Sequence, residues 1–143
     1  MVRELAASPR IVLFACVHNA GRSQMAAALF NAFADPRKAR AISAGTDPGA
    51  RVHPEVVAAM REVGIDLADA SPTRLTNELA GQVQLLVTMG CGESCPFVPG
   101  LRRKDWDLPD PKGQPLDKVR KIRDDIRDRV ERLARAEGWR AHD

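Results

Sequence analysis

The 143-residue chain contains no tyrosine, and aromatic residues make up only 4% of it. We therefore do not expect a binding cleft lined with aromatic rings, because a flat ligand would find little to stack on. The apolar run at residues 11–17 is too short for a secretory signal peptide, and no segment approaches the length of a membrane span. These absences predict a cytoplasmic protein that does not act at a membrane.

A large excess of charge is also lacking, since the net charge is +3 and the isoelectric point is near 9.0. This balance suits an anionic ligand but is too mild to favour nucleic-acid binding, and no RNA- or DNA-reading motif is present. The densest basic run, residues 102–104, is interpreted as a solvated loop. The apolar fraction of 44% is ordinary for a globular protein. We expect one domain at residues 10–143 after a flexible tail at residues 1–9.

Cysteine is scarce as well, with three in the chain, at Cys16, Cys91 and Cys95. An odd number of cysteines without an export signal argues against a framework of structural disulfides. It favours thiols that react or bind a metal ion.

Strands and helices alternate along the chain. Strands are expected at residues 10–16, 39–44 and 83–89, and helices at residues 23–33, 54–64, 75–81 and from 116 onward. This alternation predicts an α/β fold with a parallel sheet. In such sheets ligands bind beyond the carboxyl ends of the strands, and Cys16 and Cys91 each follow a strand end. We therefore expect both thiols at the same edge of the molecule.

The run that begins at Cys16 has the composition of an oxyanion-binding loop with a nucleophile. A strand delivers the thiol, and Arg22 closes the loop before a helix starts. Backbone N–H groups and the helix N-terminus would converge on one anion, and the Arg22 guanidinium would bind two of its oxygens. The positive electrostatic field of these groups would favour the thiolate form of Cys16. The alternative is a small buried cysteine at a strand end. The predicted substrate-binding residues are Val17, His18, Asn19, Ala20, Gly21, Arg22 and Ser23.

The second cluster is the run from Cys91 to Pro96. Its two cysteines lie four positions apart, and they can form a disulfide if the backbone unwinds, which Gly92 permits. The alternative is a metal site that adds a histidine or Cys16 to the pair. Redox use is favoured because zinc ligands usually come in two close pairs, and the histidines of this chain are scattered. No metal site is therefore predicted.

The third cluster is the segment from Trp106 to Pro111. Asp110 lies between two prolines, so its backbone is stiff and the direction of its side chain is restricted. Such a carboxylic acid can protonate a leaving oxygen, but an aspartate in a turn before proline is also common. Asp105 and Asp107 on the same segment are rivals for the role of general acid.

Five short segments identify a family by their order and spacing, although each alone is modest evidence. They are Cys16-x5-Arg22-Ser23-Gln24-Met25-Ala26, Ser43-Ala44-Gly45, Thr88-Met89-Gly90-Cys91, Cys95-Pro96 and Trp106-x3-Asp110-Pro111. With them the chain resembles the arsenate reductases built on the low-molecular-weight protein tyrosine phosphatase fold. The likeness extends from the first strand to the final helix. It implies a flavodoxin-like α/β three-layer sandwich with a small parallel sheet of about four strands flanked by helices.

The resemblance also implies roles for the residues of the oxyanion loop and the acid segment. Cys16 is the nucleophile, Arg22 holds the oxyanion, and Ser23 stabilises the thiolate. Asn19 maintains the shape of the loop, and Asp110 is the general acid, which favours it over its rivals.

The two late cysteines resemble the resolving cysteines of these reductases. In this scheme Cys91 attacks Cys16 and releases arsenite, and Cys95 then attacks Cys91. Members that use thioredoxin have a longer insert between the late cysteines, and some carry a potassium-binding glutamate where Ala27 stands here. We therefore expect no potassium site. The electron donor is expected to be thioredoxin, with a small thiol such as mycothiol or glutathione as the alternative.

The expected substrate is arsenate, with phosphate or sulfate as competing oxyanions, and the protein is expected to be a monomer without a cofactor that contributes to arsenic detoxification. A tyrosine phosphatase is the first alternative, but Lys112 follows Asp110-Pro111 where those enzymes commonly carry tyrosine. A non-enzymatic oxyanion or metal sensor that uses the three thiols is the second.

Overall fold

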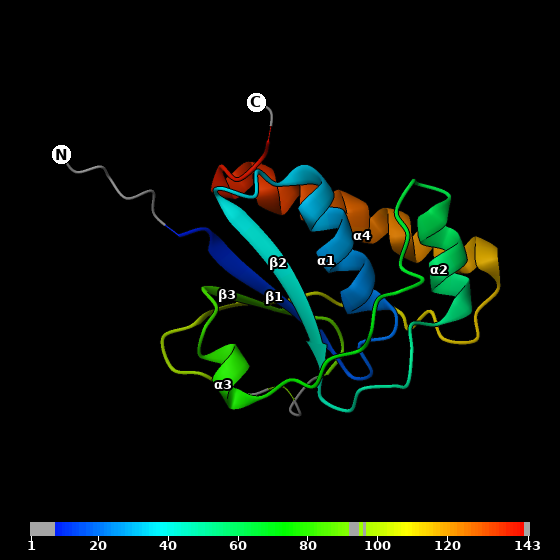
Figure 1. Ribbon diagram of the computed structural model, residues 1–143, viewed down its shortest axis with the longest axis horizontal. Coiled ribbons are helices and arrows are strands. Elements are labelled where there is room, and N and C mark those ends of the chain that lie inside the picture. Colours follow the sequence, from blue (N-terminus) through cyan, green and yellow to red (C-terminus); the bar gives the residue numbers. More distant parts are fainter. Residues whose placement is uncertain (1–7, 92–94, 96, 142–143) are drawn as a thin grey trace.

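Figure 1 shows the computed structural model, which describes residues 8–91, 95 and 97–141. Most of the predicted N-terminal tail, residues 1–9, lies outside the described part. The elements follow one another as β1 (Arg10–Cys16), α1 (Arg22–Phe33), β2 (Ala39–Gly45), α2 (Pro54–Arg61), α3 (Asn77–Ala80), β3 (Leu85–Thr88), β4 (Arg102–Asp105) and α4 (Leu116–Glu137).

The four strands form one parallel sheet in the order β2-β1-β3-β4. The central strand β1 pairs with β2 along its whole length, up to the pair Cys16 and Gly45, and with β3 on its other side. β1 and β3 are almost wholly apolar and buried, as expected for strands that are covered on both faces. The carboxyl ends of all four strands therefore meet at the edge where Cys16 lies.

The edge strand β4 corrects the interpretation of residues 102–104 as a solvated loop. These residues pair in parallel with β3, although all four residues of β4 are exposed. Charged side chains are typical of an edge strand, where they discourage pairing with other chains, so the strand carries no alternation of apolar and polar residues. Residues 102–105 join the sheet through backbone pairing with β3. The sheet therefore has four strands, which confirms the prediction of about four.

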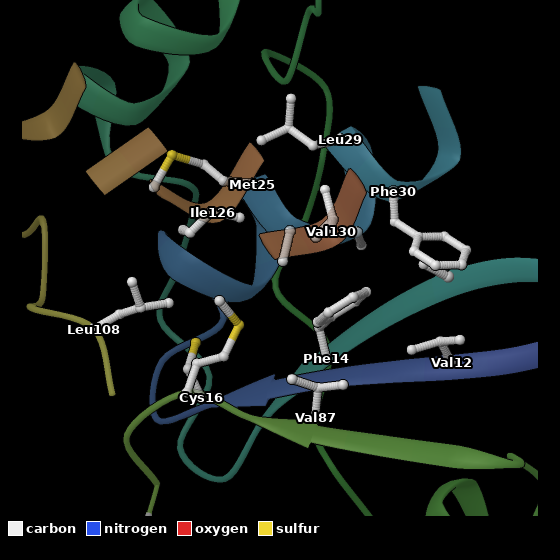
Figure 2. Close-up of a cluster of buried hydrophobic side chains, with 14 of the residues drawn as sticks. Val12, Phe14, Cys16, Met25, Leu29, Phe30, Val87, Leu108, Ile126 and Val130 are labelled. Atoms are coloured by element: carbon white, nitrogen blue, oxygen red, sulfur yellow. The ribbon is translucent and has the colours of Figure 1, made fainter. Parts of the chain in front are cut away.

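Helices cover both faces of the sheet, which gives the three-layer α/β sandwich that the sequence predicts. Figure 1 shows α1, α2 and α4 on one face and the short α3 on the other. Alternate residues of β1 divide between the two cores. Phe14 and Cys16 pack with α1 and α4 in the larger core (Figure 2), whereas Leu13 and Ala15 pack on the α3 side together with Cys91 and Cys95.

An ion network fastens α2 to α4 behind the site. Glu62 follows α2 and accepts hydrogen bonds from Arg120 and Arg123 of α4, and these bonds lower the pKa of Glu62 from its ordinary value of 4.5 to about 2. Arg123 is buried and also donates to the carbonyl of Ala59 at 2.8 Å. α2 is therefore held in place at its C-terminal end, and its N-terminal end, at Pro54, points toward the site.

Candidate active site

The oxyanion loop, residues 16–23, joins β1 to α1 and is braced from outside by residues 46–53. Four backbone N–H groups of residues 46–53 donate hydrogen bonds to carbonyls of the loop. They run from Thr46 to Cys16 (3.2 Å), from Asp47 to Val17 (2.7 Å), from Gly49 to His18 (2.9 Å) and from His53 to Ala20 (2.9 Å). With these carbonyls turned outward, the N–H groups of the loop face inward, and α1 begins after Gly21 without a side-chain cap. Both features supply donors for an oxyanion.

Asn19 holds the loop in its curved form from within. Its backbone adopts the left-handed conformation (φ 51°), and its side chain is fully buried. The side-chain nitrogen donates to Ser23 Oγ at 2.7 Å, while Oδ1 accepts from the Thr73 N–H at 2.8 Å and from Gln24 Nε2 at 3.1 Å. The amide thereby links the loop to α1 and to the segment that follows α2.

Two residues that support this loop were given no role from the sequence. Gln24 Nε2 also donates to the carbonyls of Asn19 and Ser71, at 3.1 and 3.2 Å. Gly45 ends β2 at a point where a Cβ atom would lie 2.5 Å from the Val17 carbonyl oxygen, so only glycine lets the loop pass this closely. Both residues were part of the segments that carried the resemblance, but nothing local in the sequence showed what they contact.

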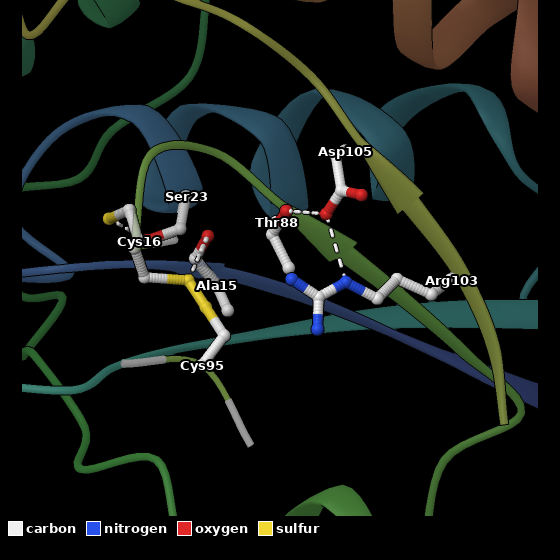
Figure 3. Close-up of a disulfide and its surroundings, with 8 residues drawn as sticks. Ala15, Cys16, Ser23, Thr88, Cys95, Arg103 and Asp105 are labelled. Carbon is white, nitrogen blue, oxygen red and sulfur yellow. Dashed lines mark hydrogen bonds and ion pairs between the residues drawn. A yellow bond between two sulfur atoms is a disulfide. The ribbon is translucent and has the colours of Figure 1, made fainter. Parts of the chain in front are cut away.

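Cys16 is buried at the end of β1, and its Sγ lies 2.8 Å from Ser23 Oγ (Figure 3). Because Ser23 Oγ already accepts a hydrogen bond from Asn19, its own hydrogen is free to point at the sulfur. The thiol at the end of β1 and the hydroxyl at the start of α1 therefore lie within hydrogen-bond distance of each other.

The guanidinium of Arg22 is held beside the loop by groups from distant segments. Nη1 donates to the Leu108 carbonyl at 3.1 Å, and the residue is buried. Gly90, which follows β3, adopts a positive φ of 106°, and a Cβ atom there would lie 2.5 Å from Arg22 Nη1. The guanidinium thus packs directly against Gly90, a contact that no local pattern in the sequence indicates.

We expect Gly90→Ala to weaken oxyanion binding, because the new methyl group must displace the guanidinium. The loss of phosphate affinity should be at least about tenfold, since a charge-assisted hydrogen bond contributes about 1.5–3 kcal/mol. Gly64→Ala is the matched control, because Gly64 has φ +82° but nothing within 4 Å of the added Cβ. Both variants should lose about 1–2 kcal/mol of stability from backbone strain. Calorimetric titration with phosphate distinguishes the two variants. Equal phosphate affinities would contradict the proposed role of Arg22 in oxyanion binding.

Asp110 lies at the same site as Arg22, on the loop between β4 and α4. Its Oδ2 is 3.9 Å from Arg22 Nη2, and its side chain is about half exposed. Its Oδ1 accepts the Lys112 N–H at 3.0 Å, and the next N–H, of Gly113, donates to Glu55 of α2 at 2.8 Å. The orientation of the Asp110 carboxyl toward Arg22 is therefore set by its own loop, and the contact with Glu55 anchors that loop to α2.

The rival carboxylates point elsewhere. Asp105 accepts hydrogen bonds from the Thr88 hydroxyl and from Arg103 Nε, and these bonds, that from Thr88 first, lower its pKa (Figure 3). Asp107 is exposed and lines a cavity together with Cys95. Of the three candidates, the structure brings Asp110 to Arg22.

We expect Asp110→Asn to slow the first chemical step by about 10²–10⁴-fold, the usual contribution of a general acid. Asparagine keeps an oxygen that accepts the Lys112 N–H, so the loop should hold its shape. Asp107→Asn on the same segment is the matched control and should react almost normally. Rapid-quench measurement of a single turnover with arsenate tests both. A crippled Asp107→Asn with a normal Asp110→Asn would show that the wrong carboxylate has been chosen.

Cys91 and Cys95 form a disulfide, with their Cα atoms 5.5 Å apart. Residues 92–94 and 96 of this run lie outside the described part, so the predicted unwinding at Gly92 is not described. Cys91 Sγ lies 4.0 Å from the carbonyl oxygen of Ala15, the neighbour of Cys16 in β1. Cys95 lines a cavity of about 630 Å³ whose rim carries Phe97, with 82% of its surface exposed. Both cysteines are buried, and the pair runs from the strand edge at the oxyanion loop to the wall of this cavity.

Within residues 8–91, 95 and 97–141, no three side chains of histidine, cysteine, aspartate or glutamate are grouped to hold a metal ion. His142, one of the scattered histidines, lies outside these ranges. Both late thiols are used by the disulfide, and the third, Cys16, contacts Ser23. No helix of the described chain is long and apolar enough to cross a membrane.

Residues 11–138 match the family of low molecular weight phosphotyrosine protein phosphatases. The chain belongs to this family. It is 36% identical over 125 residues to a glutaredoxin arsenate reductase of Synechocystis, a match that covers 85% of this chain and 94% of the relative.

Solved structures agree with this family assignment. A thioredoxin-dependent arsenate reductase of Corynebacterium glutamicum is 37% identical with a TM-score of 0.79, and the match covers 92% of this chain but only 63% of that longer one. A low molecular weight protein tyrosine phosphatase from T. tengcongensis is 26% identical, also with a TM-score of 0.79, over 90% of this chain and 99% of the other. Two arsenate reductases and a phosphatase are thus all similar to this chain, so the choice between the two activities depends on its own residues.

Proposed function

We propose that this protein reduces arsenate to arsenite. The observation that carries the proposal is the disulfide-forming pair Cys91 and Cys95, which starts beside the strand end that holds Cys16. Phosphate ester hydrolysis needs a nucleophile, an oxyanion loop and an acid, but it has no use for two further thiols. The relatives named as arsenate reductases support the same choice.

Arsenate has the tetrahedral shape and the charge of phosphate, so an oxyanion loop of this kind suits it. The inward N–H groups of the loop, the N-terminus of α1 and Arg22 would bind its oxygens and the charge that develops during attack. Phosphate and sulfate would compete for the same donors. The predicted binding residues, Val17 to Ser23, are all part of this loop.

The first step uses Cys16 and Asp110. The thiolate of Cys16 attacks arsenic, and Asp110 gives a proton to the oxygen that leaves as water. The product is an adduct in which arsenic is still in the +5 state and bound to Cys16 Sγ. Ser23 Oγ, 2.8 Å from Sγ, is within reach to donate a hydrogen bond to the sulfur.

Reduction follows when a second thiolate attacks Cys16. Cys91 forms a disulfide with Cys16, the bond between sulfur and arsenic breaks, and its electron pair stays on arsenic, which leaves as arsenite. Cys95 then attacks Cys91 and frees Cys16, so that the oxidation ends on the Cys91–Cys95 disulfide. The placement of Cys91 and Cys95 supports the last exchange of this scheme, because the two sulfurs lie within reach of each other.

We propose thioredoxin as the electron donor in the cytoplasm, with a small thiol such as mycothiol or glutathione as the alternative. A donor must reduce the Cys91–Cys95 disulfide by two electrons to start a new cycle. Cys95 lines the surface cavity beside the exposed Phe97, which offers an approach for a reducing protein. The Corynebacterium relative, which is thioredoxin-dependent, supports this choice. We expect the protein to act as a monomer without a cofactor, in arsenic detoxification.

Counting free thiols before and after addition of arsenate to the fully reduced protein tests this function. A reductase should lose two thiols for each arsenite formed, a phosphatase should lose none, and a sensor should lose thiols only when a metal is added. The same titration with phosphate is the control. A reconstituted assay with thioredoxin, thioredoxin reductase and NADPH, run beside assays with glutathione and with mycothiol, identifies the donor. Arsenate that leaves all three thiols free would contradict the proposal.

A further inference from the structure

The Cys91–Cys95 pair has a binding chemistry that the proposed relay does not use. The two cysteines form a disulfide, and their Cα atoms are 5.5 Å apart. Reduction gives two thiols whose backbone positions let both sulfurs bond to one atom. Two thiols at this spacing are a chelating group for a soft element that prefers sulfur ligands.

The surroundings of the pair suit a neutral ligand. Both side chains are buried, and they belong to the core cluster on the α3 side of the sheet that contains Leu13, Ala15 and Leu86. A charge taken out of water into such surroundings needs a partner, whereas a neutral group does not. The oxyanion loop has the opposite character, because its N–H groups and Arg22 favour an anion.

The number of thiols limits which element the pair can hold. Within residues 8–91, 95 and 97–141, no third cysteine, histidine, aspartate or glutamate joins the two to form a metal site. A structural zinc ion takes four ligands, but trivalent arsenic forms three bonds and needs only two sulfurs and one hydroxyl group. The third thiol is placed elsewhere, because Cys16 packs in the core on the other face of the sheet and contacts Ser23 (Figure 3).

Cys95 gives the pair access to solvent. It lines the cavity of about 630 Å³, whose wall also carries Arg103, Asp105 and Asp107. The cavity is wide enough to admit a molecule as small as arsenous acid. Its polar wall suits the one hydroxyl group that arsenic keeps when two sulfurs replace the others.

We propose that the reduced Cys91–Cys95 pair binds arsenite, the product of the proposed reaction. Arsenous acid, which is uncharged near neutral pH, exchanges two of its hydroxyl groups for the two sulfurs, and these hydroxyl groups leave with the thiol protons as two molecules of water. Arsenic stays in the +3 state, so nothing is oxidised or reduced. The binding itself does not depend on the proposed function, which only supplies the arsenite.

Bound arsenite inhibits the relay, and this consequence rests on the proposed function. A Cys91 sulfur that is bonded to arsenic cannot attack Cys16, although the oxyanion loop is still free to bind arsenate. Additional arsenate therefore does not reverse the inhibition. The oxidised protein binds no arsenite, because its two late sulfurs are bonded to each other.

Calorimetric titration with arsenite tests the site on protein that has been reduced with a phosphine and desalted without oxygen. We expect one arsenite per chain, and alkylation of the complex should find two fewer reactive thiols. The oxidised protein is the matched control and should give no heat of binding. Cys91→Ser and Cys95→Ser should each lower the affinity by at least about a hundredfold, because a second linked contact adds about 10²–10⁴-fold. Cys16→Ser should bind arsenite as tightly as the unchanged protein.

A single turnover of the reduced protein with arsenate, run without an electron donor, tests the inhibition. Incubation with arsenite beforehand should slow the formation of the disulfide, which mass spectrometry counts, and a higher arsenate concentration should not restore the rate. Failure of the reduced protein to bind arsenite, equal binding by the oxidised protein, loss of binding in Cys16→Ser or full relief by arsenate would overturn the inference. Arsenite that binds to the pair in a protein that forms no disulfide with arsenate would support this site and contradict the reductase, so either proposal can fail alone.

Discussion

Replacing Cys16 with serine is expected to abolish arsenate reduction while oxyanion binding survives. The loop proposed to bind the anion would do so mainly with backbone N–H groups, and its shape is held by Asn19 and by N–H groups of residues 46–53 that donate to the loop carbonyls. None of these groups depends on the sulfur. A serine hydroxyl is not ionised near neutral pH and forms no disulfide, so neither the attack on arsenic nor the release of arsenite can take place.

Two measurements on Cys16→Ser separate binding from chemistry. Calorimetric titration with phosphate should give an affinity close to that of the unchanged protein, and the reconstituted assay should give no arsenite. Ser23→Ala is the comparison variant, because it keeps the thiol and removes only the hydrogen bond to it. That variant should react slowly but measurably. Turnover by Cys16→Ser near the normal rate would mean that Cys16 is not the nucleophile.

The serine variants of the two late cysteines are expected to stop the reaction at different steps. Without Cys91, no internal thiol is placed to attack Cys16, so the adduct with arsenic should accumulate unless an external thiol releases it. Without Cys95, the reaction should proceed once and stop at a Cys16–Cys91 disulfide. The difference follows from position, because Cys91 lies next to Ala15 at the end of β1 while Cys95 lines the surface cavity.

Peptide mapping under non-reducing conditions identifies the trapped species in each variant, and each serine variant serves as the control for the other. A Cys95→Ser variant that cycles normally with thioredoxin would remove the third thiol from the mechanism. Rapid turnover of both variants with glutathione or mycothiol would place the protein among enzymes that take electrons directly from a small thiol.

The elements that were predicted best are those with a clear local pattern. The bounds of β1 agree at both ends, and the long helix α4 begins at Leu116 as expected, because its apolar residues recur at steps of three and four. β3 is shorter than predicted, although the Met89 N–H just beyond its end still donates to the Ala15 carbonyl of β1 at 2.7 Å. β4 was missed because its four exposed residues have no apolar alternation, and its pairing depends on β3.

Local sequence patterns were enough to predict the alternation of strands and helices, the parallel sheet and the position of the loop that starts at Cys16. These features depend on residues that are adjacent in the chain, so composition and spacing reveal them. The roles predicted for Cys16, Arg22 and Asp110 stay predictions, which the variants described above test.

The groups from distant parts of the chain that meet at this loop could be identified only from the folded structure. Gly90 contacts Arg22, Glu55 anchors the segment that carries Asp110, and the late cysteines share the carboxyl edge of the sheet with Cys16 while they pack on its other face. Such contacts join residues that are dozens of positions apart. Their geometry is set by chain topology and by the exclusion of overlapping atoms, and neither leaves a pattern in the local sequence.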